Sequence, residues 1–224
     1  MGVLLIADSG STKAEWCLLD GNKKKRVITT GLSPYFVSGQ QMQQVFKEVL
    51  YPKISQQLPD EIFFYGTGCS NPQNLKTIKA ALKSVFTKSA ISVDHDLIGA
   101  SRALCGHKKG IACILGTGSN SCFYNGKKIV KNSPGLGYVL GDEGSGAYLG
   151  KKVVQYFLYN TFDPDLMDRF NAKYHLSASE ILDSVYKQPL PNRYLAGFCM
   201  FLSENRGHYM IENIIEDSFN EFFF

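Results

Sequence analysis

The first 105 residues show the two hydrophobic periodicities that distinguish short strands from amphipathic helices. The periodicities predict strands at residues 2–7, 14–20, 26–30, 61–65 and 90–94, and helices at residues 39–57, 75–86 and 97–105. Three hairpin-linked strands followed by strand–helix alternation predict an α/β fold, with a mixed sheet and helices on its faces.

The same opening pattern begins again near residue 110. Strands are predicted at residues 111–115 and 120–124, and Asn125-Gly126 is a strong hairpin signal before a third strand at 127–131. The later helices are predicted at about residues 146–160, 163–174, 177–187, 192–205 and 209–224. Because the strand–turn–strand–hairpin unit occurs twice, we predict two related domains, residues 1–109 and residues 110–224. The second lacks later strand–helix pairs and carries an apolar cluster at 222–224, so we expect it to be incomplete at its C-terminus.

Composition is that of a folded domain. The chain has 224 residues, of which 44% are hydrophobic and 20% charged. Without a signal peptide or a run of about 18 apolar residues, a cytoplasmic protein with reduced thiols and no membrane partner is expected. The six cysteines form no C-x-x-C pair and the four histidines stand singly, so no zinc site is predicted.

The net charge of +4 is spread along the chain, apart from one basic run at Lys23–Arg26. For this run we favour a solvated hairpin turn over a contact with nucleic-acid phosphates or a membrane surface. A nucleic-acid surface usually needs a wider basic stripe, so no nucleic-acid partner is expected.

The first group of candidate functional residues is the polar turn Asp8-Ser-Gly-Ser-Thr-Lys13. A tight turn between two strands points successive backbone N–H groups into one concavity, which suits phosphate oxygens. Gly10 permits close approach of the backbone, and the hydroxyls of Ser11 and Thr12 add donors. Lys13 adds positive charge, and Asp8 at the strand end is a candidate to hold Mg²⁺ through water. Taken alone, the motif is equally compatible with a polar hairpin that binds nothing.

The second group, Gly116, Thr117, Gly118, Ser119 and Asn120, follows the equivalent strand of the second copy. Two such loops, one from each domain, can clamp one polyphosphate, and the pair is more specific than either loop alone. Neither is a Walker A loop, and neither opens directly into a helix, which weakens a Rossmann interpretation.

Asp96 lies between the two loops, at the end of a predicted strand and the start of a helix. Phosphoryl transfer to an alcohol needs a group that accepts the hydroxyl proton, and a carboxylate at a strand end can do so. Asp96 is therefore the candidate general base, with a helix N-cap as the equally weighted alternative. The neighbouring His95 is expected to be a solvated surface residue.

The glycine-rich segment at residues 133–146 indicates backbone approach to a ligand, followed by a helix N-terminus. Asp142 is placed to accept hydrogen bonds from sugar hydroxyls or to hold a metal. The alternative is a flexible loop in which Asp142 or Ser145 caps the helix.

Three motifs in this order resemble the BadF/BadG/BcrA/BcrD ATPase family and, within it, the N-acetylglucosamine kinases. They are DSGSTK at 8–13, ILGTGSN at 114–120 and GLGYVLGDEGSGAYLG at 135–150. The resemblance implies two ribonuclease-H-like, actin-like ATPase domains with mixed sheets around a nucleotide cleft, the second of them helix-rich. It also implies a kinase that uses ATP and Mg²⁺ to phosphorylate an N-acetylated amino sugar, and it suggests a homodimer.

The resemblance also assigns roles to individual residues. It places both glycine loops on ATP, makes Asp96 the catalytic base and gives Asp142 a contact with the sugar. Gly66 and Thr67 match a loop beside the sugar, and Asn120 is expected at the substrate.

The sequence departs from the family pattern at two points. Ser33 stands where the family more often carries Asn, so it is a candidate sugar contact that leaves the identity of the sugar open. The family's late adenosine motif is not found, so weak nucleotide binding is expected of this chain alone.

Two other functions stay open. One is an activator ATPase of the 2-hydroxyacyl-CoA dehydratase/benzoyl-CoA reductase type, which would need cysteines at a dimer surface for an iron–sulfur cluster. The other is a non-catalytic sugar or nucleotide sensor.

Overall fold

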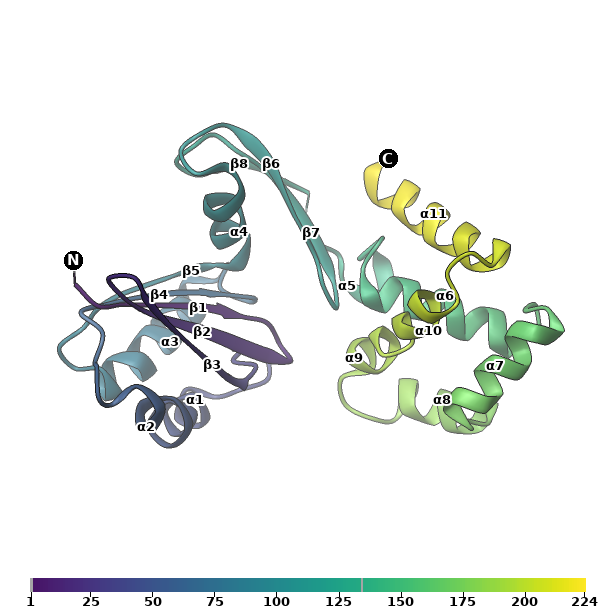
Figure 1. Ribbon diagram of the computed structural model, residues 1–224, viewed down its shortest axis with the longest axis horizontal. Coiled ribbons are helices and arrows are strands. Elements are labelled where there is room, and N and C mark those ends of the chain that lie inside the picture. Colours follow the sequence, from purple (N-terminus) through teal and green to yellow (C-terminus); the bar gives the residue numbers. More distant parts are fainter. Residues whose placement is uncertain (1, 134) are drawn as a thin grey trace. The chain divides into compact units, whose positions relative to one another are not determined.

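The computed structural model of the chain describes residues 2–133 and 135–224 and separates into two compact units (Figure 1). The N-terminal unit comprises Met1–Ala112 and Tyr124–Ile129, and the C-terminal unit comprises Cys113–Phe123 and Val130–Phe224. Met1 of the predicted first domain and Pro134 of the predicted glycine-rich segment lie outside the described residues.

The N-terminal unit is built on a five-stranded mixed sheet with the order β3-β2-β1-β4-β5. Strand β1 pairs antiparallel with β2 and parallel with β4, which in turn is parallel to β5. The five strands are β1 (Leu4–Ser9), β2 (Lys13–Asp20), β3 (Lys23–Thr30), β4 (Glu61–Gly66) and β5 (Ala90–His95). All five strands predicted from the sequence are present, to within three residues at each end.

Helices cover both faces of this sheet (Figure 1). On one face, alternate residues such as Leu5, Trp16 and Phe64 form a buried core with apolar residues of α1 (Gly39–Val45), α2 (Tyr51–Ile54) and α3 (Pro72–Val85). On the other face, α4 (Asp96–Cys105) packs on β4.

The helix predicted at residues 39–57 is interrupted and ends early. A π-helical turn at Phe46–Leu50 separates α1 from α2, which ends at Ile54. Pro52 has no N–H to donate to the carbonyl four residues earlier, which is a sufficient reason for the irregular hydrogen bonding at this point.

A second, three-stranded sheet has the order β6-β7-β8, and the boundary between the two units passes through it. Its strands are β6 (Gly110–Leu115), β7 (Ser119–Tyr124) and β8 (Ile129–Ser133). Strand β8 starts two residues later than predicted because the Asn125 side-chain oxygen accepts the N–H groups of Lys127 and Lys128, which keeps these residues in the turn.

The C-terminal unit is otherwise helical. Its helices are α5 (Gly137–Leu140), α6 (Gly146–Leu158), α7 (Pro164–Tyr174), α8 (Ala178–Tyr186), α9 (Pro191–Ala196), α10 (Cys199–Glu204) and α11 (Tyr209–Phe223). Their apolar faces enclose one core that includes Val153, Phe170, Ile181, Phe201 and Ile211. Helix α6 packs closely on α9, since a Cβ atom at Gly150 would lie 1.8 Å from the Leu195 carbonyl oxygen.

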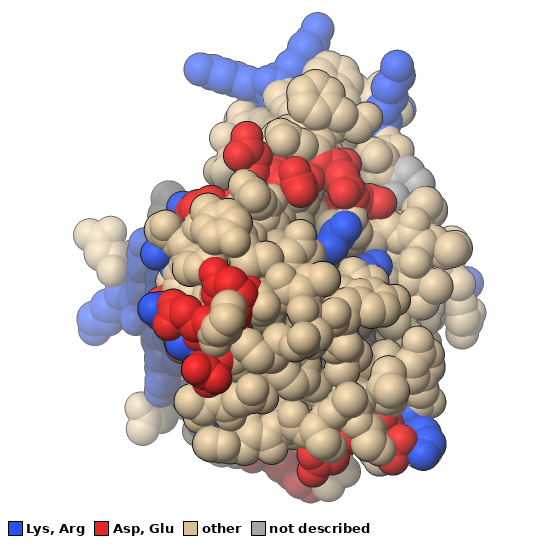
Figure 2. Space-filling view, turned by 90° about the vertical axis from the view of Figure 1, so that its right-hand side faces the viewer, with Lys and Arg blue, Asp and Glu red and all other residues tan. Residues whose placement is uncertain are grey.

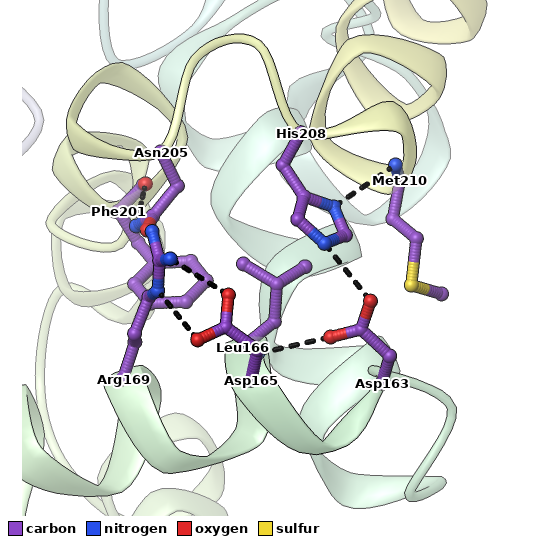
Figure 3. Close-up of polar contacts among 8 residues, drawn as sticks. All are labelled: Asp163, Asp165, Leu166, Arg169, Phe201, Asn205, His208 and Met210. Carbon is purple, nitrogen blue, oxygen red and sulfur yellow. Dashed lines mark hydrogen bonds and ion pairs between the residues drawn. The ribbon is translucent and has the colours of Figure 1, made fainter.

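Polar side-chain contacts connect α7 to the turn that precedes α11 (Figure 3). Asp163 caps α7 by accepting the N–H of Leu166, and its second carboxylate oxygen lies 2.9 Å from His208 Nε2. His208 in turn caps α11, because its Nδ1 accepts the N–H of Met210. The two helix starts are therefore fixed to each other through their own capping side chains.

Two predictions for this unit are wrong in detail. The helix predicted at 192–205 is broken by a turn at Gly197 and Phe198 into α9 and α10, and the segment predicted as a loop contains the short helix α5.

On the face shown in Figure 2, acidic residues form a few groups on a mostly uncharged surface. None of the described helices is long and apolar enough to cross a membrane.

Candidate functional site

The candidate site of the N-terminal unit lies where three parallel strands end together. The register pairs Ser9 of β1 with Gly66 of β4, and Gly66 with His95 of β5. In open α/β sheets, ligands bind at the carboxyl ends of parallel strands. This edge brings the turn at residues 8–13 together with Gly66, Thr67 and Asp96.

The turn at residues 8–13 is held in shape by backbone hydrogen bonds. The N–H of Gly10 donates to the Lys13 carbonyl at 3.0 Å, and the N–H of Gly31 donates to the Thr12 carbonyl at 3.0 Å. Among the described residues, no group accepts the N–H of Ser11 or of Thr12. These two donors therefore have no acceptor within the described part of the chain, and their use by an anion stays a prediction.

Gly31 is a structural partner of this turn that the sequence analysis does not identify. A Cβ atom at this position would lie 2.3 Å from the Ser11 carbonyl carbon and oxygen. Only glycine therefore allows the chain after β3 to lie directly against the turn. The contact joins residues 20 positions apart, so no local pattern in the sequence indicates it.

The charges around the turn are partly balanced within the chain. The ammonium group of Lys13, predicted as a phosphate contact, lies 2.5 Å from Glu15 on the exposed surface. The pKa of the Asp8 carboxyl is raised above its ordinary value, mainly by partial burial and to a smaller extent by the negative charge of Asp96. The carboxylates of Asp8 and Asp96 therefore act on each other electrostatically, which is the arrangement that a nearby cation would stabilise.

Asp96 is the first residue of α4 and not its N-cap, so the alternative role considered for it is wrong. The N-cap is His95, whose Nδ1 accepts the N–H of Leu97 at 3.2 Å. Asp96 Oδ1 accepts the same N–H at 2.8 Å and lies 3.0 Å from His95 Nδ1. The expectation of a solvated His95 is also wrong, because its side chain is 21% exposed and serves as a cap.

Ser33 carries a buried hydroxyl without a partner. The residue is 1% exposed, and no described group makes a hydrogen bond to its Oγ. Its neighbour Leu32 donates its N–H to the Ser9 hydroxyl at 3.2 Å, and Thr67 donates its N–H to the Ser9 carbonyl at 2.9 Å. Ser33 therefore follows directly on a segment that is tied to the strand-end site.

The second glycine loop belongs to the C-terminal unit and wraps around the start of α6. The N–H groups of Gly146 and Ala147 donate to the carbonyls of Gly116 and Thr117, at 2.8 and 3.0 Å. Ser145 caps the helix by accepting the N–H of Tyr148, so Asp142 is not the cap. These donors are used within the chain, so the first turn of α6 offers none of these N–H groups to a ligand.

The free donors of this region lie on the loop itself. No described group accepts the N–H of Thr117 or Gly118, whereas the N–H of Gly116 donates to the Gly118 carbonyl at 2.9 Å. On the following strand, Asn120 has a buried Oδ1 for which the described residues supply no donor. The loop therefore offers backbone donors and one buried amide oxygen.

Asp142 joins the glycine-rich segment to this loop. Its Oδ1 accepts the N–H of Gly137 at 3.2 Å, and a Cβ atom at Gly118 would lie 2.7 Å from its other oxygen. Partial burial raises the pKa of the Asp142 carboxyl, and hydrogen bonds from the backbone of Gly137 and Ser119 oppose this shift. Its φ of 60° is unusual for a residue with a side chain, and such strain is often found at functional positions.

The described residues contain no group of three His, Cys, Asp or Glu side chains arranged to hold a metal ion. This does not disfavour Mg²⁺, which commonly binds through one or two carboxylates together with water and substrate phosphates.

No protein-family model matches the chain, and no curated protein sequence matches it. Among solved structures, a candidate N-acetylglucosamine kinase from Porphyromonas gingivalis is 39% identical, with a TM-score of 0.94, and the match covers 98% of this chain and 78% of that one. The chain belongs to the N-acetylglucosamine kinase family.

Two more distant structures share the fold of this family member. A candidate N-acetylglucosamine kinase from Chromobacterium violaceum is 19% identical, with a TM-score of 0.69 over 97% of this chain and 79% of that one. The ROK hexokinase from Thermus thermophilus is 12% identical, with a TM-score of 0.51 over 97% of this chain and 88% of that one. The predicted actin-like α/β fold class is confirmed.

Proposed function

We propose that this chain is an ATP-dependent sugar kinase that phosphorylates an N-acetylated amino sugar such as N-acetylglucosamine. The observation that carries the proposal is the 39% identity with the Porphyromonas gingivalis protein, over 98% of this chain and 78% of that one. The strand-end cluster supports it independently, because it combines free backbone donors with two carboxylates at the expected edge of the sheet.

Asp96 is the proposed general base. Its Oδ1 accepts the N–H of Leu97, and this hydrogen bond orients the carboxylate at the start of α4. From this position it would accept the proton of the sugar hydroxyl as that oxygen attacks phosphorus. The nearby carboxylate of Asp8 would add negative charge and so favour binding of a cation at the same edge of the sheet.

The residues present fit a nucleotide with Mg²⁺. The free N–H groups of Ser11 and Thr12, with Gly10 beside them, suit phosphate oxygens, and Asp8 suits Mg²⁺ held through water. In the C-terminal unit, the free N–H groups of Thr117 and Gly118 are the matching donors. ATP supplies the phosphoryl group, and Mg²⁺ neutralises phosphate charge.

Sugar contacts are proposed at Ser33, Gly66, Thr67, Asn120 and Asp142. The unpartnered oxygens of Ser33 and Asn120 are the strongest support, because buried polar atoms are nearly always hydrogen-bonded and a sugar hydroxyl would supply the missing partner. The specific sugar is left to experiment.

We further propose that the chain falls within the BadF/BadG/BcrA/BcrD group, as two actin-like domains with a boundary near residue 110, and that it assembles as a homodimer. The activator ATPase alternative receives little support from the thiols. Burial raises the pKa of Cys69 to about 12, whereas a cluster ligand must be a thiolate.

The test is sugar-dependent ADP release by the full-length protein with magnesium-ATP. The sugars are N-acetylglucosamine, N-acetylmuramic acid, glucosamine and glucose. Asp96→Asn should lower kcat by about 10²–10⁴-fold, the usual contribution of a general base. Asp94→Asn is the matched control, since Asp94 lies two residues earlier and is 3.6 Å from Arg102, and it should retain most activity. A folded protein that binds ATP but turns over none of the sugars would refute the kinase.

A further inference from the structure

A cavity of about 210 Å³ lies at the opposite end of the N-terminal sheet from the candidate site. It is bounded by the β2–β3 hairpin and the end of α2. The register pairs Asp20 with Lys23 at this hairpin, whereas Ser9 and Ala14 are paired at the other end of β2. The cavity is therefore separate from Asp8 and Asp96.

The charge lining the cavity is strongly unbalanced. Lys23, Lys24, Lys25 and Lys53 line it, against Asp20 as the single acidic residue. None of these side chains takes part in any of the ion pairs within the described part of the chain. A concave surface lined by one sign of charge concentrates its field and attracts counter-ions.

The backbone explains why the lysines converge here. Residues two apart on a strand share a face, so Lys25 leaves β3 on the same side as the buried Val27. That side faces the helices, and Lys53 comes from the last turn of α2. Leu18 and Ile54, both buried, supply the apolar part of the lining.

We propose that this cavity binds a small anion that carries a phosphate group. Lysine is a common phosphate ligand as a point charge. The volume equals about seven water molecules at about 30 Å³ each, which is enough for a phosphate and a small substituent. A nucleic acid would need a longer basic stripe than one hairpin and one helix end provide.

The test is a residue-resolved NMR titration of the full-length protein with inorganic phosphate, at constant ionic strength set by chloride. Amide signals of residues 21–26 and 53–57 should shift along one saturating curve with phosphate and stay unchanged with chloride alone. Signals of residues 10–13 are followed separately, because the proposed nucleotide site also attracts phosphate. Their curve should be independent of the curve at the hairpin.

Lys25→Gln combined with Lys53→Gln should weaken the hairpin response at least tenfold and leave the response at residues 10–13 intact. Lys127→Gln combined with Lys128→Gln is the matched control, since these lysines lie on the turn before β8, away from the cavity lining, and it should stay within twofold of the unmodified protein.

A parallel titration with a sugar 6-phosphate identifies the source of the phosphate. Tighter binding by tenfold or more indicates a phosphorylated metabolite, and equal binding indicates phosphate itself. Three results would overturn the proposal in favour of a solvated hairpin. The hairpin signals do not shift with phosphate, chloride alone shifts them equally, or the shifts persist in the protein with the Lys25 and Lys53 changes.

Discussion

Replacing Gly150 with alanine should destabilise the helical unit, because α6 and α9 touch at this glycine. The new Cβ would lie 1.8 Å from the Leu195 carbonyl oxygen and 2.7 Å from its carbon. Cβ atoms essentially never come within 3.0 Å of such atoms, so the two helices must separate by about 1.2 Å. The obstacle is backbone, which cannot turn aside as the end of a flexible side chain could.

The expected loss follows from two opposing terms. Overpacking a well-packed core costs about 1–3 kcal/mol, and a shift of more than 1 Å between two helices belongs at the upper end of that range. Against this, replacing a mid-helix glycine with alanine stabilises the helix by about 1 kcal/mol. The net destabilisation is therefore about 2 kcal/mol, which lowers Tm by about 4–8 °C in a protein of this size.

The assay is thermal and urea unfolding followed by far-ultraviolet circular dichroism, with Gly197→Ala as the control. Gly197 has a right-handed helical φ of −58°, and its Cβ would lie 3.1 Å from the Tyr194 carbonyl oxygen, which needs an adjustment of only a few tenths of an ångström. The control should change Tm by no more than about 2 °C, which corresponds to at most about 0.5–1 kcal/mol. A Gly150→Ala protein as stable as its parent would show that the two helices can separate without loss, and would refute the reasoning.

Two further predictions concern the candidate site. Ser33→Ala removes a buried hydroxyl that lacks a partner. The ligand-free protein should therefore be as stable as its parent, or more stable by up to about 1 kcal/mol. The KM for the sugar should rise about two- to tenfold, because the proposed contact is lost. Lower stability with an unchanged KM would indicate a purely structural hydroxyl. The second prediction concerns Asp8, whose raised pKa means that ionising this carboxyl destabilises the folded protein. The stability that the protonated carboxyl contributes is fully present below pH 3.8, its ordinary pKa, and is lost as the pH rises through the folded pKa. Asp8→Asn should therefore raise Tm at pH 7 and have little effect at pH 3, and a benefit confined to low pH would contradict this sign.

The elements that the sequence predicts well are those in which one face is buried. Leu5 and Ala7 on β1, and Trp16 and Leu18 on β2, alternate with less buried neighbours, and this period of two specifies both strands. The errors fall where tertiary contacts decide. The break at Gly197 has no counterpart in the apolar pattern, because the residues on both sides of it face the same core.

For the candidate site, the sequence indicates which loops matter but not how their groups are paired. Lys13 is a reasonable phosphate ligand by position, yet its pairing with Glu15 depends on how two side chains on the same face of β2 meet. Gly31 and Thr12 are far apart in sequence and adjacent in the fold. The free N–H groups of Ser11 and Thr12 can be identified only when every neighbouring acceptor has been located.

The start of α4 shows how one local detail bears on the proposed chemistry. A carboxylate at the N-cap is folded back onto the first N–H groups of its helix, so its oxygens are committed to the backbone. Because His95 fills that position, Asp96 stands one residue later and gives only Oδ1 to a backbone donor. Among the hydrogen bonds of the described residues, none engages its Oδ2. A base needs an oxygen that is free to accept a proton, so His95 as the cap is what makes the proposed role of Asp96 compatible with a properly terminated helix.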